Sequence, residues 1–100
     1  MRSVMSAYLI GEFEVTNPAG LAPYRAAVND TIVRHGGRFI IRGGATLLKE
    51  GGPPPKYVVV IEFPNADALE RWWRSPEYQE ILPFRLNNTT GRVFTVDGVE

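Results

Sequence analysis

The sequence predicts an α+β domain with the ferredoxin-like order β-α-β-β-α-β, in which an antiparallel four-stranded sheet carries its helices on one face. Four segments have the alternating or continuous apolar pattern of strands, and the stretches between them carry apolar residues at helical spacing. The chain has 100 residues, which is the length of one domain, and no linker divides it. We therefore expect a single domain over residues 1–100.

The first strand is expected at residues 6–16, where apolar side chains alternate with a mixed polar and apolar set. Asn17 and Pro18 follow as an N-cap and a proline suited to the first helical position. Pro23 would remove an amide from the interior of this helix. We therefore expect an irregular first turn and a regular helix over about residues 23–34.

The second strand is expected at residues 38–42, and residues 46–49 could continue it beyond a Gly-Gly bend. The glycine- and proline-rich residues 50–55 predict a surface loop, because three prolines cannot join a sheet interior. Residues 57–63 form a continuous β-branched and aromatic run, which is typical of a strand covered on both faces.

The second half of the chain is expected to contain two helices. Asn65 caps a helix that carries both tryptophans, and Ser75 caps a shorter helix that is expected to end at Pro83. Residues 87–91 have turn chemistry, and residues 92–96 predict the last strand.

Composition excludes several classes of protein. The formal net charge is zero, which gives no electrostatic footprint for nucleic acid or for an anionic membrane. No cysteine is present for a disulfide framework or thiolate chemistry. The N-terminal segment lacks the apolar core of a signal peptide, and no run of apolar residues is long enough to span a membrane. We expect a cytoplasmic protein.

The sheet face opposite the helices is predicted to be too apolar to stay exposed in a monomer. If alternation holds, it carries Tyr8, Ile10, Glu12, Ile40, Arg42, Val58, Val60, Glu62, Phe94 and Val96. A second copy packed sheet to sheet would cover these side chains, so we expect a homodimer.

Four segments also carry a family resemblance: YLIGEFEVTNP, HGGRFIIRGG, YVVVIEFPNADALERWW and SPEYQEILPFR. Together they resemble the short bacterial proteins of the domain of unknown function 1330 family, over nearly the whole chain. The resemblance implies the dimeric α/β-barrel version of the ferredoxin-like fold, in which two sheets close around a central cavity. It implies no particular activity.

The first candidate site is Glu12, Arg42 and Glu62 on the face opposite the helices, with Tyr8 beside them as a ligand-binding candidate. A carboxylate desolvated in an apolar cavity has a raised pKa, so Glu62 or Glu12 could act as a catalytic base and Arg42 as an anion anchor. The alternative is a salt-bridge network that ties two subunits together.

A second candidate set lies in the tryptophan-bearing region. The set is Trp72, Trp73, Tyr78, Arg85 and Asn88, by analogy with cofactor-independent monooxygenases of this fold that hold flat phenolic substrates. Trp72, Arg85 and Asn88 are its ligand-binding candidates, and Arg85 could bind a carboxylate as an anion anchor. The alternatives are core packing for the tryptophan and a surface ion pair for Arg85.

His35 is the only histidine and a further ligand-binding candidate, although the dipole of the preceding helix accounts for it equally well. No second histidine and no cysteine supports a metal or haem site, so we expect neither metal nor cofactor.

These observations predict a homodimer that binds a small molecule. If the protein is an enzyme, we expect it to act without a cofactor on a small organic acid or phenolic compound. The alternative is a non-catalytic ligand-binding or structural dimer whose Glu and Arg pairs serve the interface.

Overall fold

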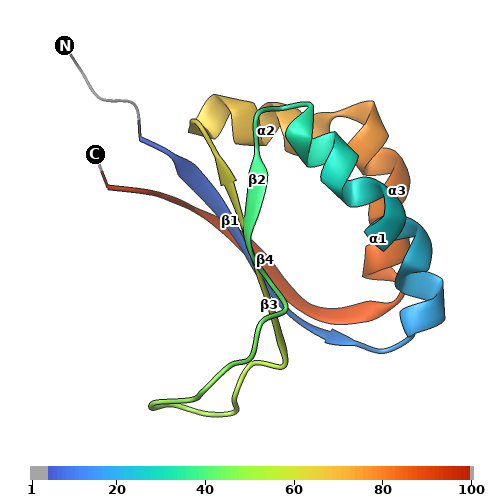
Figure 1. Cartoon of the computed structure of the whole chain (residues 1–100). Helices are drawn as coiled ribbons and strands as arrows, with labels where there is room; N and C mark the ends of the chain where they lie inside the picture. The colour runs from blue at the N-terminus through green and yellow to red at the C-terminus, as the bar shows by residue number, and fades with distance from the viewer. Residues whose placement is uncertain (1–4, 100) are drawn as a thin grey trace.

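The computed structural model describes residues 5–99. Within them a four-stranded sheet carries three helices on one face and leaves the other face open (Figure 1). In chain order the elements are β1 (Ala7–Val15), α1 (Pro18–Val33), β2 (Arg38–Arg42), β3 (Tyr57–Phe63), α2 (Ala66–Arg74), α3 (Pro76–Leu86) and β4 (Thr89–Asp97). The prediction of an α+β, ferredoxin-like fold is confirmed. Two helices, α2 and α3, stand in place of the second helix of the β-α-β-β-α-β order.

The sheet has the strand order β2-β3-β1-β4, and every neighbouring pair is antiparallel. Tyr8 of β1 lies opposite Glu62 of β3 and Val96 of β4, so the three side chains share the open face. Leu9 and Ile61 are paired one residue further along and lie on the helix-bearing face.

The core lies between the sheet and the helices. Trp72 of α2 is fully buried, and its indole Nε1 donates a hydrogen bond of 3.0 Å to Thr31 Oγ1 of α1. Its ring also packs against Phe63 and Tyr78, with centroid distances of 5.3 and 4.1 Å. Burial of such large aromatic surfaces, with the indole N–H satisfied, fixes α1, α2 and α3 against one sheet face.

The predicted helix caps are confirmed. Asn17 Oδ1 accepts from the Gly20 amide at 3.2 Å, and Asn65 Oδ1 accepts from the Ala68 amide at 2.8 Å. Ser75 both ends α2 and begins α3, because its hydroxyl donates to the Trp72 carbonyl and accepts from the Tyr78 amide.

Two helix boundaries differ from the predictions. Helix α1 begins at Pro18 and passes through Pro23, and α3 passes through Pro83 to end at Leu86. Both prolines are exposed, as are Ala19 and Gln79 four residues before them. Water can therefore satisfy the carbonyl that each proline leaves without an amide partner, which reduces the penalty of an internal proline.

Strand β2 is shorter and less regular than predicted. Residues 46–49 are not a strand, and residues 43–56 instead form a long arm that extends beyond the sheet (Figure 1). The register shifts between Phe39 and Ile41, so that Ile41 pairs with Val60 and Arg42 with Val59. This bulge moves Arg42 to the helix-bearing face, because one extra residue reverses the facing of all that follow.

Strand β4 begins at Thr89, three residues earlier than predicted, so part of the expected turn is paired with β1. Within residues 5–99, none of the helices has the length and apolar character needed to cross a membrane.

Candidate functional site

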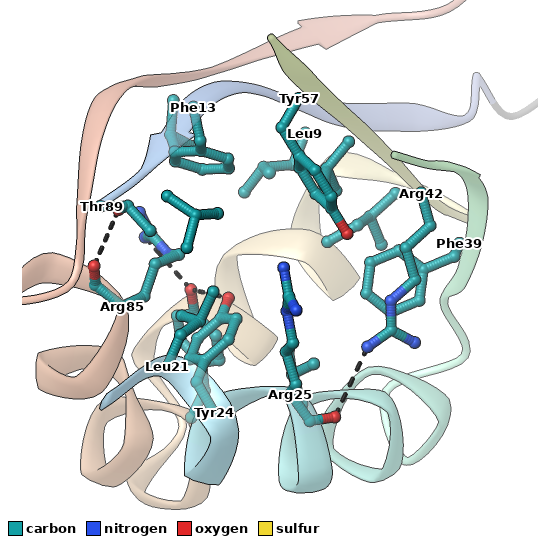
Figure 2. A pocket seen from close by; sticks show the side chains of 16 residues that line it. Leu9, Phe13, Leu21, Tyr24, Arg25, Phe39, Arg42, Tyr57, Arg85 and Thr89 are labelled. Carbon is teal, nitrogen blue, oxygen red and sulfur yellow. Dashed lines mark hydrogen bonds between the residues drawn. The ribbon is translucent and has the colours of Figure 1, made fainter. Parts of the chain in front are cut away.

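A pocket opens between the helix-bearing face of the sheet and helices α1 and α3 (Figure 2). It holds about 560 Å³ of empty space, including solvent at its open mouth. All four strands contribute to its lining, together with α1 and α3. The lining is largely aliphatic and aromatic, and its ionisable side chains include three arginines: Arg25, Arg42 and Arg85.

Arg85 occupies the buried end of this pocket. Only 7% of the residue is exposed, and its guanidinium lies 5.1 Å from the centroid of the Phe13 ring and 5.7 Å from that of Tyr24. One of its nitrogens donates a hydrogen bond of 3.3 Å to the Tyr78 hydroxyl, which is itself 2.9 Å from the Tyr24 hydroxyl. A guanidinium has five N–H donors, so donors remain to face the pocket.

Arg25 and Arg42 occupy the other side of the pocket, towards β2. Figure 2 shows the Arg25 side chain rising from α1 into the pocket towards Tyr57, with Arg42 further to the right. The Arg25 guanidinium is 5.7 Å from the centre of the Tyr57 ring, and that of Arg42 is 4.3 Å from the centre of the Phe39 ring. Arg42 also donates to the Arg25 carbonyl at 3.5 Å.

None of these three arginines forms an ion pair with any carboxylate in residues 5–99, and the pocket lining contains no aspartate or glutamate. Aromatic faces and tyrosine hydroxyls stabilise the three cations only in part. Cationic side chains gathered around an apolar space without their own counter-ions are suited to binding an anion.

Tyr24, which lies beside Arg85, remains neutral near physiological pH because its pKa is raised. Burial raises the pKa of Tyr24 well above its ordinary value of 10.0, and the neighbouring Tyr78 raises it further. Burial alone would lower the pKa of Arg85, but Tyr78 and Tyr24 outweigh it and the net effect is a raised pKa. The buried end of the pocket therefore holds the Arg85 cation beside the neutral hydroxyl of Tyr24.

The predicted grouping of Glu12, Arg42 and Glu62 on one face is wrong. The two carboxylates lie on the open face, where Glu12 is 3.8 Å from Arg92 and Glu62 is 2.9 Å from Arg38. The bulge in β2 places Arg42 on the opposite face of the sheet. Within one subunit, neither carboxylate can act on a ligand that Arg42 or Arg85 holds.

The electrostatics of Glu62 also differ from the expectation. The hydrogen bond from Arg38 Nε lowers the pKa of Glu62, and the Tyr8 hydroxyl, which donates to Glu62 Oε2 at 2.9 Å, lowers it further. A carboxylate with a lowered pKa is a weaker base, and the proposed catalytic role needs a raised one. Tyr8 itself lies on the open face and does not line the pocket.

Three other candidates lie outside the pocket. Trp72 is a core residue, and Asn88 donates to the Phe84 carbonyl at 2.7 Å while its own carbonyl accepts from the Thr16 amide. The His35 ring hydrogen-bonds the Thr31 carbonyl at 2.9 Å through Nδ1 and places Nε2 3.7 Å from Glu77. Of the predicted ligand-binding residues, the structure brings Arg42 and Arg85 into one pocket.

The sequence analysis overlooked Arg25 and Tyr57. Arg25 follows the buried Leu21 by four residues, which is the spacing of side chains on one helix face. Tyr57 lies two and four residues before Val59 and Ile61, so its side chain is on the same face of the strand, and all three line the pocket. Both signals were present in the sequence, but neither indicates a cavity by itself.

No cluster of three or more histidine, cysteine, aspartate or glutamate side chains suited to a metal ion occurs among residues 5–99.

The fold and pocket together define a ferredoxin-like α+β protein with a pocket between its helices and its sheet. The family model Domain of unknown function (DUF1330) matches residues 6–99, and the chain belongs to this family. The comparison with curated proteins finds no match.

Several solved structures share the fold. A protein of unknown function from Rhodopseudomonas palustris superposes with a TM-score of 0.75 at 16% identity, over 96% of this chain and 84% of that one. SnoaB, a cofactor-independent oxygenase from Streptomyces nogalater, has a TM-score of 0.68 at 19% identity, over 97% of this chain and 96% of its own. A dimeric ferredoxin-like protein of unknown function from Thermobifida fusca has a TM-score of 0.59 at 15% identity, over 100% of this chain and 95% of its own.

Proposed function

We propose that this protein binds a small organic acid in the pocket between the sheet and helices α1 and α3. The observation that carries the proposal is the set of three guanidinium groups, Arg25, Arg42 and Arg85, which border an apolar space without a carboxylate partner in the described chain. An anionic group on the ligand would supply the missing counter-charge.

The rest of the lining favours a flat, apolar ligand body. Phe13, Phe39 and Tyr57 present aromatic surface, and Leu9 and Val59 supply aliphatic contacts from the centre of the sheet. Ligand pockets of this kind combine a mainly apolar wall with a few polar groups that fix orientation. An aromatic carboxylate meets both requirements.

Binding can be tested with 2-naphthoate as the probe, by isothermal calorimetry and by amide chemical-shift mapping. We expect saturable binding and shifts centred on α1 and on the Arg85 end of α3. The variant Val93→Phe fills the pocket from β4 and should abolish binding, whereas Val33→Phe, on an exposed part of α1, should not. Shifts confined to the open sheet face, or equal affinity in both variants, would refute the proposed site.

We also propose that the open sheet face is the interface of a homodimer. It exposes Ile41, Phe94 and Val96 to 44%, 40% and 46%, and the pairs Arg38–Glu62 and Arg92–Glu12 stand on the same face. A second copy would cover the apolar side chains, and the ion pairs would then serve the interface. The dimeric description of the Thermobifida fusca neighbour supports this proposal.

A second candidate function is catalytic: cofactor-independent oxidation of a phenolic acid in the same pocket. The fold shared with SnoaB favours it, and guanidinium groups would stabilise a phenolate. In such a reaction a hydroquinone carboxylate gives two electrons and two protons to dioxygen, forming a quinone and hydrogen peroxide. Oxygen uptake with 2,5-dihydroxybenzoate, matched by peroxide and lost in Arg85→Met, would support it. Oxygen uptake at the rate measured without protein would refute the catalytic proposal and leave the binding proposal unaffected.

A further inference from the structure

The three arginines of the pocket are not gathered at one point. Arg85 lies at the buried end and contacts Phe13 of β1 and Tyr24 of α1. Arg42 and Arg25 lie at the exposed side, beside Phe39 of β2 and Tyr57 of β3. Figure 2 shows Arg85 on the left of the pocket and Arg42 on the right, with the Arg25 side chain rising between them.

The sheet gives a scale for this separation. In the order β2-β3-β1-β4, the strand that carries Arg42 is two positions from the strand whose Phe13 ring meets Arg85. Two strand spacings amount to about 10 Å. A single carboxylate cannot reach both cationic ends over this distance with hydrogen bonds of roughly 3 Å, so a ligand that engages both ends needs an acidic group at each of them.

The two ends also differ in their chemistry. Arg85 is held in place by Tyr78 and by two aromatic rings, and its buried charge is poorly screened by salt. Arg25 and Arg42 are exposed residues, and their charges can rearrange and are screened. A buried fixed cation and an exposed cationic pair, separated by apolar surface, would each favour an acidic group on the ligand.

We propose that the pocket selects aromatic diacids over monoacids, with one carboxylate on Arg85 and the second on Arg25 and Arg42. This inference rests on the proposed binding function and adds the charge and length of the ligand to it. Terephthalate has the required form: one ring with a carboxylate at each end. Monomethyl terephthalate has the same ring and nearly the same length but a single charge, so it is the matched monoacid.

The test compares the affinities of these two acids by calorimetry. We expect terephthalate to bind about tenfold more tightly than its monomethyl ester, as a second charge-assisted contact would give. The double substitution Arg25→Gln with Arg42→Gln should bring this ratio close to one. The double substitution Arg34→Gln with Arg71→Gln, at two exposed arginines outside the pocket, removes the same net charge and should leave the ratio near tenfold.

Ionic strength supplies an independent readout. The advantage of the diacid should shrink as salt rises from 50 to 500 mM, because the outer arginines are exposed to screening ions. A ratio near one in the unmodified protein, or a ratio that survives the double substitution, would overturn the inference while leaving monoacid binding intact. If neither acid binds and 2-naphthoate does not bind, the proposed function itself fails.

Discussion

At the scale of single residues, Arg85 carries the most information about function. Its guanidinium is buried and has no carboxylate partner among residues 5–99, and aromatic faces and tyrosine hydroxyls offset the desolvation penalty of its charge only in part. For stability alone, an apolar side chain of similar size would serve better. Under the proposed function, Arg85 is kept for ligand binding at some expense of stability.

This view predicts the behaviour of Arg85→Met. We expect the free energy of unfolding to change by no more than about 1 kcal/mol, because methionine fills similar space and removes a buried charge. Binding of 2-naphthoate should weaken by tenfold or more. Urea unfolding and calorimetry on the same preparation measure the two quantities. A loss of several kcal/mol of stability with unchanged binding would make Arg85 a structural residue.

Tyr24 gives a second prediction, on alkaline stability. Its folded-state pKa is raised above the ordinary value of 10.0, so above that pH the unfolded chain loses a proton that the folded protein keeps. The stability is therefore fully present below about pH 10 and declines as pH rises further. Tyr24→Phe removes this titrating group, and its melting temperature should fall less steeply between pH 9.5 and 11.5. Parallel curves for the two proteins would contradict the raised pKa.

At the scale of elements, the close approach of β1 and β4 depends on Gly91. This glycine has a φ of 148°, and a Cβ built on it would overlap the Glu12 carbonyl oxygen. The carbonyl belongs to the paired backbone of β1, so it cannot move aside cheaply. A side chain at this position would push β1 and β4 apart. Both strands contribute residues to the pocket and to the open face.

We therefore expect Gly91→Ala to destabilise the fold by roughly 2–4 kcal/mol in urea unfolding. Gly44→Ala is the matched control, because no atom lies within 4 Å of the Cβ it would add. That control should stay within about 0.5 kcal/mol of the unmodified protein. Equal effects at the two positions would mean that the strands can separate without loss.

The elements also show how far the sequence alone leads. Side-chain alternation predicted the facing of β1, β3 and β4 correctly, because paired strands with one covered face hold their register. Polar caps predicted helix starts at Asn17, Asn65 and Ser75, because a cap is a local interaction. The prolines inside α1 and α3 were misjudged, because their penalty depends on exposure, which tertiary packing decides.

The site was harder to predict than the fold, and a single bulge explains much of the difference. The sequence RFIIR at residues 38–42 contains no glycine or proline to indicate an irregularity, so regular alternation put Arg42 on the open face. The register shift between Phe39 and Ile41 reverses that facing and places Arg42 in the same pocket as Arg85. Arg85 was a candidate from the sequence and lies in the pocket, whereas Arg25 could be recognised only once α1 and the sheet are placed together.

At the scale of the whole molecule, the two faces of the sheet carry different sets of side chains. The helix-bearing face holds the arginine-lined pocket, and the open face holds apolar side chains together with the Arg38–Glu62 and Arg92–Glu12 pairs. If the open face is the dimer interface, dimerisation and ligand binding use different residues of the same strands. A change on one face should then leave the property of the other largely intact.

Phe94→Glu tests this separation. A carboxylate in the middle of the proposed interface removes apolar burial and adds a charge near Glu12 and Glu62, which should weaken a dimer more than a hundredfold. Sedimentation equilibrium at micromolar concentration should give twice the monomer mass for the unmodified protein and the monomer mass for the variant. Thr95→Glu, at the neighbouring exposed position of the same strand on the helix-bearing face, controls for the added charge. The monomeric variant should still bind 2-naphthoate. If binding is lost together with the dimer, a second subunit helps to form the pocket. If the unmodified protein is itself monomeric, the proposed interface is refuted.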